Sequence, residues 1–231
     1  MRQNNVSAPR SDGARRGCSL SSTLGLALLA IVALLVILGS EPETQGWGAR
    51  LFASEPSGPR VGIIAGHWQS DSGAICDDGL QEVDVNLQIA QATVELLRAQ
   101  GYRAELLAEF DPALDGYVAA ALVSVHCDSC VADLSGFKVA RLTDSAVPET
   151  EDRLVDALYQ AYEVETGLAP HPNTITNDMR QYHAFRRIAP ATPGAIIECG
   201  FLGGDRLMLT HQQDRVARGI AEGIIAFLSP E

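Results

Sequence analysis

Short apolar runs rich in β-branched residues recur along the chain, with turn-forming residues between them. Runs of this kind predict buried strands, because a strand covered on both faces has no polar side. The clearest is Ala195–Leu202, which follows Pro193-Gly194 and precedes Gly203-Gly204. The pattern predicts strands at 61–65, 103–108, 121–125, 137–142 and 195–202.

Apolar residues at helical spacing lie between these strands. Val85, Ile89 and Leu96 recur in the segment that starts at Glu82, and Gly101 stops it. Strands that alternate with helices are typical of three-layer α/β domains, so we predict a central, mostly parallel sheet of about six strands flanked by helices. Helices are expected at 82–100, 148–166 and 212–227, with a short helical piece around 179–188.

A long uncharged segment lies near the N-terminus. No charged residue occurs from Gly17 to Gly39, which is enough chain to span a bilayer, since a span needs about 20 apolar residues. Arginines precede the segment and glutamates follow it, so the positive-inside rule places everything after residue 40 outside the cytoplasm. A cleaved signal peptide is the alternative, although the apolar run is long and no A-x-A site follows it. The expected organisation is a basic cytoplasmic tail at 1–16, a transmembrane anchor at 17–39, a flexible linker at 40–60 and a folded domain at 61–231.

The charge is unevenly distributed. The net charge is −12, but the first 40 residues carry four arginines against one aspartate, which leaves −15 on the rest. That acidic part contains a single lysine, Lys138. It therefore has no basic surface of the kind that binds nucleic acid, and we expect no nucleic-acid partner.

The cysteines fit an oxidising compartment. Cys18 lies at the cytoplasmic edge of the predicted anchor, and the other four lie in the predicted external domain. Four cysteines allow three pairings. We favour Cys76 with Cys130, a disulfide that joins the loops after the first and third strands. Cys127 and Cys199 are then either two buried thiols or a second disulfide.

Polar side chains that can bind metal follow three of the predicted strands. His67, His126 and Glu198 come at the C-terminal ends of their strands, the edge where open α/β sheets form ligand sites. Glu82 opens the first helix and can reach the same edge. Zinc accepts histidine nitrogen and carboxylate oxygen, and catalytic zinc sites use three protein ligands and one open position. The trio His67, Glu82 and His126 is a candidate zinc site, although no H-E-x-x-H pattern is present, and Glu198 is a candidate base beside it.

Five short motifs occur in a fixed order within the predicted domain. They are Gly66-His67, Ser72-Gly73-Ala74, Glu82–Leu87, Ser124-Val125-His126 and Ile197–Leu202. In this order the chain resembles the zinc-dependent N-acetylmuramoyl-L-alanine amidases of bacterial cell-wall hydrolysis over residues 61–228.

The resemblance implies a reaction and a role for each site residue. The family hydrolyses the amide between the lactyl group of N-acetylmuramic acid and the L-alanine of the stem peptide, so the expected substrate is peptidoglycan or a muropeptide. By resemblance, His67, Glu82 and His126 hold one Zn²⁺ ion, and Glu198 is the catalytic acid and base. The implied mechanism is attack of zinc-activated water on the carbonyl, with Glu198 carrying the proton.

The chain departs from the family pattern at positions expected to contact substrate. Trp68-Gln69 stands where the family has a glycine-rich turn, and Cys127-Asp128 stands where Ala-Asn is usual. A common arginine before the third strand has no clear counterpart in residues 111–120. Trp68 and His183 are candidate substrate-binding residues, and packing of the tryptophan on the domain is the alternative for the first.

Two other functions remain open at this point. One is a catalytically silent module that binds cell-wall peptides, and the other is a zinc hydrolase that cleaves a different amide. Asp84 and Asn86 are interpreted as helix-surface or capping groups. The sequence identifies no protein partner; the membrane is expected to be contacted through the anchor.

Overall fold

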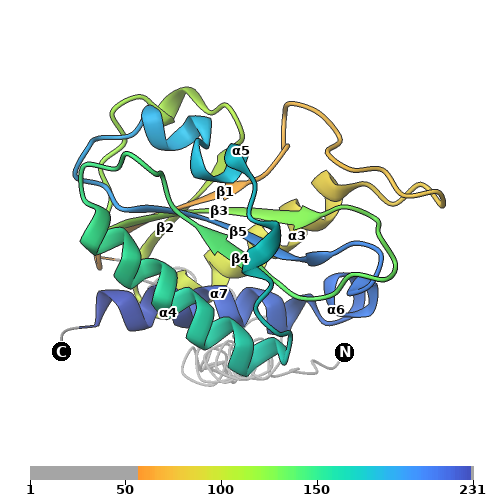
Figure 1. Ribbon diagram of the computed structural model, residues 1–231. Coiled ribbons are helices and arrows are strands. Elements are labelled where there is room, and N and C mark those ends of the chain that lie inside the picture. Colours follow the sequence, from red (N-terminus) through yellow and green to blue (C-terminus); the bar gives the residue numbers. More distant parts are fainter. Residues whose placement is uncertain (1–56, 230–231) are drawn as a thin grey trace, which may run out of the picture. The chain divides into compact units, whose positions relative to one another are not determined.

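One five-stranded sheet lies at the centre of the structure, a computed structural model that describes residues 57–229 (Figure 1). Its strands are β1 (Arg60–Ala65), β2 (Arg103–Ala108), β3 (Ala121–Asp128), β4 (Lys138–Ala140) and β5 (Gly194–Phe201). The α-helices are α3 (Glu82–Ala99), α4 (Pro148–Thr166), α5 (Asn177–Arg180), α6 (Arg206–His211) and α7 (Gln213–Leu228). Single turns of 3₁₀-helix are η1 (Pro112–Leu114), η2 (Pro172–Thr174) and η3 (His183–Arg186).

The strand order is β2-β1-β3-β5-β4. The first four strands in this order are parallel, and β4 is antiparallel to β5. The predicted mostly parallel sheet is confirmed, but the described residues form five strands, not about six. The edge strand β4 reverses direction because the segment that joins it to β3 contains no crossover helix, which a parallel return needs.

The two faces of the sheet are covered differently. On one face α3, α4 and α7 pack together over the sheet and bury a large apolar core that includes Ile63, Val123 and Ile197 (Figure 1). On the other face the cover consists of short turns and loops, which contribute side chains such as Leu114 and Phe185 to a smaller core. The predicted three layers are therefore present, with a third layer of short segments in place of long helices.

The order in which the strands are added to the sheet reverses at β1. The strand after β1 in sequence, β2, lies on one side of it, and β3 lies on the other. In open α/β sheets a change of this kind leaves a crevice at the carboxyl ends of the two central strands, because the connections diverge to opposite sides. His67 follows β1 and His126 lies near the end of β3, so both lie at this crevice.

The predicted tail at 1–16 and anchor at 17–39 lie outside the described residues, as does most of the linker at 40–60. Its last residue, Arg60, is the first of β1. Among residues 57–229, no helix has the length and apolar character needed to cross a membrane.

Candidate metal centre

The three predicted ligands converge at the carboxyl edge of the sheet. One ligand atom from each of His67, Glu82 and His126 lies within 4.8 Å of the others. Oε1 of Glu82 lies between the two imidazoles, 3.2 Å from Nε2 of His67 and 3.2 Å from Nδ1 of His126. The ring centroids are 4.9 Å apart and the rings are nearly perpendicular. Two nitrogens and one carboxylate oxygen therefore face a common point.

Each ligand is placed by a different local feature. His67 follows the end of β1 and has a φ of 65°, a left-handed conformation that few residues other than glycine adopt. Glu82 is the first residue of α3, where the N-terminal end of the helix dipole stabilises a negative charge. His126 lies within β3 and is buried. A turn, a helix end and a strand thus supply one ligand each.

Donors surround the Glu82 carboxylate, which is only 5% exposed. Its Oε1 accepts hydrogen bonds from Nδ2 of Asn86 at 3.0 Å and from the backbone N–H of Cys127 at 3.3 Å. Its Oε2 accepts the backbone N–H of Ala74 at 3.0 Å. The interpretation of Asn86 as a surface or capping group is wrong: Asn86 is fully buried and also donates to the carbonyl of Gly66.

The charges of the cluster depend on one another. Burial raises the pKa of Glu82, but hydrogen bonds with His126 and His67 outweigh this and hold the pKa well below its usual range. Burial lowers the pKa of His126, but hydrogen bonds with Glu109 and Glu82 raise it to about 10. The anionic carboxylate is therefore compensated by the positive charge of a neighbouring imidazole, the same sign of charge that a cation bound there would supply.

Close packing around the cluster excludes any side chain at two glycine positions. A Cβ at Gly73 meets Oε2 of Glu82 at 2.5 Å and Cδ2 of His67 at 2.7 Å. A Cβ at Gly66 meets the His126 ring at 2.4 Å. The donor set of two imidazoles and one carboxylate fits zinc, and these glycines allow the backbone to approach the ligands closely.

Glu198 lies beside the cluster without joining it. It is the register partner of His126 across β3 and β5. Its Oε2 is buried and makes no hydrogen bond within residues 57–229. Burial raises the pKa of Glu198 to about 7. A carboxyl group with a pKa near neutrality can both accept and release a proton at working pH.

Sequence analysis missed Glu109 and Tyr182. Glu109 directly follows β2 and accepts the backbone N–H of His67 at 2.8 Å. Its Oε1 also accepts a hydrogen bond from the hydroxyl of Tyr182 at 2.7 Å and lies 2.7 Å from Nε2 of His183. Both His67 and Glu109 are polar residues that come just after a predicted strand, so the signal that identifies His67 is also present at Glu109. Tyr182 had no such signal, since it lies in a loop far along the chain.

The two candidate substrate-binding residues lie in different settings. His183 is partly exposed, its Nε2 contacts Glu109, and the ring of Phe110 stacks on it at 4.3 Å. Trp68 is partly buried and packs against the main core. The packing alternative considered for Trp68 is therefore the one that the structure supports.

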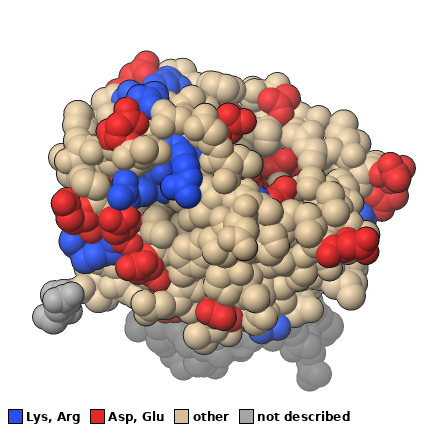
Figure 2. All heavy atoms as spheres, in the orientation of Figure 1, with Lys and Arg blue, Asp and Glu red and all other residues tan. Residues whose placement is uncertain are grey.

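Acidic and basic side chains are distributed unevenly over the face of the molecule shown in Figure 2. Figure 2 shows Asp and Glu side chains set back in a hollow on the right of the view, whereas Lys and Arg gather mainly on the left. His67 retains partial exposure, so solvent can reach the cluster.

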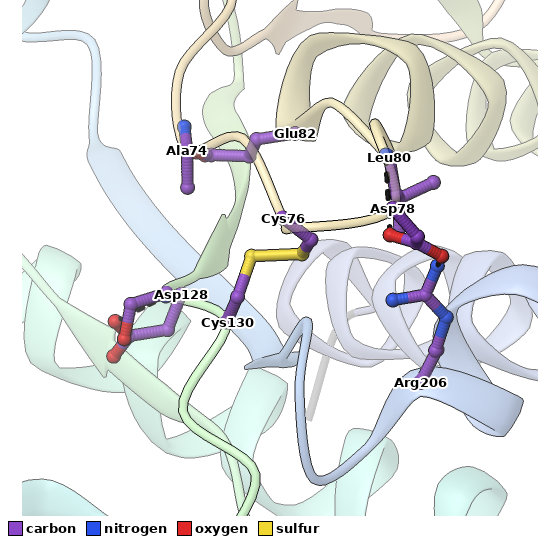
Figure 3. The surroundings of a disulfide bond; sticks show 9 residues. Ala74, Cys76, Asp78, Leu80, Glu82, Asp128, Cys130 and Arg206 are labelled. Atoms are coloured by element: carbon purple, nitrogen blue, oxygen red, sulfur yellow. Dashed lines mark hydrogen bonds and ion pairs between the residues drawn. A yellow bond between two sulfur atoms is a disulfide. The ribbon is translucent and has the colours of Figure 1, made fainter.

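A disulfide joins the loop before Glu82 to the loop after His126 (Figure 3). It connects Cys76 and Cys130, the pairing favoured from the sequence, across a separation of 54 residues. Cys127 and Cys199 are buried free thiols, so the alternative of a second disulfide is wrong. The bond links the segments that carry two of the three candidate ligands.

An α/β domain that places two histidines, a buried carboxylate and a second, unpaired carboxyl group at one sheet edge has the arrangement of a metal-dependent hydrolase. The model of the N-acetylmuramoyl-L-alanine amidase family matches residues 61–226. The chain belongs to this family, whose members are zinc-dependent hydrolases of the bacterial cell wall.

Solved amidase structures share the fold. The amidase Ami1 of Mycobacterium smegmatis is 18% identical with a TM-score of 0.62, and the match covers 76% of this chain and 99% of Ami1. AmiC2 of Nostoc punctiforme is 28% identical with a TM-score of 0.55 over 73% of this chain and 96% of AmiC2. CwlD of Clostridioides difficile, solved in complex with the GerS lipoprotein, is 20% identical with a TM-score of 0.59 over 74% of this chain and 98% of CwlD. No curated protein matches the chain.

We predict that reducing the disulfide lowers the free energy of unfolding by up to about 4 kcal/mol, because a closed loop of this length restricts the unfolded chain. Denaturant unfolding with and without reductant measures the difference. The Cys76→Ser/Cys130→Ser variant serves as the control and should show no response to reductant. An unchanged midpoint for the reduced wild type contradicts the prediction.

Proposed function

We propose that the chain is a zinc-dependent amidase that hydrolyses the bond between N-acetylmuramic acid and L-alanine in peptidoglycan or muropeptides. The observation that carries this proposal is the cluster of His67, Glu82 and His126 with the unpaired carboxyl group of Glu198 beside it. Family membership supports the choice of substrate.

In this proposal His67, Glu82 and His126 would hold one zinc ion, since Nε2 of His67 and Nδ1 of His126 both face Oε1 of Glu82. When bound, zinc acts as a Lewis acid that polarises the scissile carbonyl and makes water more acidic. The buried donors around Glu82 keep its carboxylate oriented, so the ligand needs no reorganisation when an ion binds.

Glu198 is proposed to move the proton. Its carboxylate accepts a proton from the attacking water as the new C–O bond forms, and it returns the proton to the leaving nitrogen as the C–N bond breaks. Two features support this role: the buried Oε2 has no partner among the described residues, and burial brings the pKa near neutrality. The net products are the lactyl carboxylate and a stem peptide with a free L-alanine amine.

Contacts with the substrate remain a separate proposal. His183 lies next to the cluster through Glu109, and its exposed side can contact a bound glycan or peptide. Trp68 contributes less in this proposal, because its ring is partly covered by the core.

We also propose that the domain works outside the cytoplasm, held by the anchor at 17–39 or released after signal cleavage. The charge pattern around the anchor and the disulfide, a bond typical of oxidising compartments, support this location.

We predict that Glu198→Gln lowers the rate by about 100-fold or more, because general acid and base catalysis contributes that much, while zinc stays bound. Release of stem peptides with N-terminal L-alanine from purified sacculi measures the rate, and elemental analysis measures the metal. Glu222→Gln, which changes an exposed glutamate on α7, is the matched control. An unchanged rate in Glu198→Gln removes its assigned role.

We predict that His67→Ala loses the metal, since the two remaining ligands do not make a three-ligand site. Zinc content after gel filtration of the purified protein tests this. His211→Ala, at an exposed histidine in α6, should keep one zinc per chain. Full occupancy in His67→Ala is the result that contradicts the ligand set.

We predict that the mature protein keeps its N-terminal segment in the membrane. Mass spectrometry of the protein extracted from membranes should find a chain that still contains residues 17–39. A mature N-terminus near residue 40 instead supports the secreted alternative.

A further inference from the structure

The two ring nitrogens of His126 have different neighbours. Nδ1 lies 3.2 Å from Oε1 of Glu82 and so faces the cluster. Nε2 points the other way, 3.3 Å from the hydroxyl of Tyr182 and 3.5 Å from Oε2 of Glu109. In this orientation only Nδ1 of His126 faces the cluster. A neutral histidine binds a metal through the ring nitrogen that carries no proton, so Nδ1 can bind only if the proton lies on Nε2.

Glu109 contacts both histidines of the cluster. Its Oε2 accepts a hydrogen bond from the backbone N–H of His67 at 2.8 Å and also lies 3.5 Å from Nε2 of His126. Its Oε1 is occupied by Tyr182 and His183, each at 2.7 Å. The carboxylate is 6% exposed, so water does not replace it easily.

The left-handed backbone of His67 needs a restraint, and its hydrogen bond to Glu109 can supply one. A residue other than glycine in this conformation costs about 1 kcal/mol or more and persists only when its surroundings hold it. The hydrogen bond from the His67 N–H to Glu109 is one such restraint.

We propose that Glu109 is a positioning residue of the metal centre. Its carboxylate holds the Nε2–H of His126 through the Tyr182 hydroxyl, which lies 3.3 Å from Nε2 and donates to Glu109, and it places a negative charge 3.5 Å from the same nitrogen. Nδ1 is then left to bind the metal, and the carboxylate also fixes the backbone of His67. This inference rests on the zinc site of the proposed function and adds a residue to it. A carboxylate that accepts the second N–H of a metal-bound histidine fixes the ring orientation and raises its basicity.

The other histidine is arranged in the same way. Nε2 of His67 faces Glu82, and its Nδ1 lies 2.6 Å from Oδ1 of Asp71. The Asp71 side chain is 60% exposed, whereas that of Glu109 is 7% exposed. Because water can replace an exposed acceptor but not a buried one, Glu109 has the larger effect of the two.

Direct ligation by Glu109 is the competing role. The ligand atoms that come within 4.8 Å of one another belong to His67, Glu82 and His126, and Glu109 is not among them. Both of its oxygens already accept hydrogen bonds from protein groups. The geometry therefore places Glu109 behind the histidines and not at the metal.

Zinc affinity of the purified full-length chain tests the proposal, measured by competition with a chromophoric chelator. Glu109→Gln keeps the size of the side chain and should bind zinc about 10- to 100-fold more weakly, the usual effect of losing such a partner. Glu105→Gln is the matched control, since Glu105 lies in β2, the strand that Glu109 follows, and pairs with Arg60 away from the cluster. Its affinity should stay within about twofold of wild type.

A second measurement is made first on the wild type, so its main result does not depend on how well the variants fold. In ¹⁵N spectra of the zinc-loaded wild type labelled at histidine, His126 should carry its proton on Nε2 and bind the metal through Nδ1. A proton on Nδ1 overturns the proposal. In Glu109→Gln the Nε2–H signal should shift and exchange faster with water, a change that loss of packing elsewhere does not produce.

The outcomes separate this inference from the proposed function. Wild type that binds no zinc overturns both. Wild type that binds zinc and cleaves sacculi, together with a folded Glu109→Gln variant of equal zinc affinity, overturns only the role of Glu109. Weaker zinc binding in Glu109→Gln, normal binding in Glu105→Gln and an Nε2–H on His126 support it.

Discussion

The structure depends on a buried carboxylate that cannot be buried alone. Taking the charge of Glu82 out of water costs several kcal/mol unless donors and a cation compensate it. The fold provides the donors from three separate segments: Ala74 in the loop before α3, Asn86 within α3 and Cys127 in β3. The two imidazoles complete the arrangement, since each lies 3.2 Å from Oε1 of Glu82.

The parallel sheet explains how distant residues meet at this point. Parallel strands end at one edge, and the change of direction beside β1 opens a crevice there. His126 and Glu198 become neighbours because β3 and β5 pair in register, although 72 positions separate them in sequence. The disulfide between Cys76 and Cys130 then links two of the loops at the same edge. Rigid elements hold the ligand side chains, and covalent closure limits the movement of the loops around them.

A second group of polar side chains lies next to the candidate ligand His126. Glu109 and Tyr182 are buried, and hydrogen bonds of 2.7 Å connect Glu109 to Tyr182 and to the partly exposed His183. Ser124 extends this network by donating to the Tyr182 hydroxyl at 2.9 Å. Networks of this kind fix one orientation of each member, because any other leaves a buried polar group unpaired. The orientation of the second histidine therefore depends on residues outside the ligand set.

The amino-acid sequence by itself determined the local elements and the candidate ligands. Periodicity located the boundaries of α4 and β2 correctly and those of α3 within a residue, since apolar spacing and the residues that end an element are local properties. It missed α6, since the predicted helix at 212–227 corresponds to α7 alone and the six residues of α6 are too few to show a helical repeat. It also overestimated the number of strands, and it placed Asn86 at the surface.

The tertiary structure alone decided which polar groups share the site. Glu109 forms hydrogen bonds with His67 and Tyr182, which are separated from it by 42 and 73 positions in the sequence. The residues next to Glu109 in the sequence do not indicate these partners. The side of α3 that Asn86 occupies is set by where the helix lies against β1 and β3, not by the helix sequence. Strand and helix formation follow from nearby residues, whereas the pairing of buried charges follows from contacts made only when the sheet is assembled.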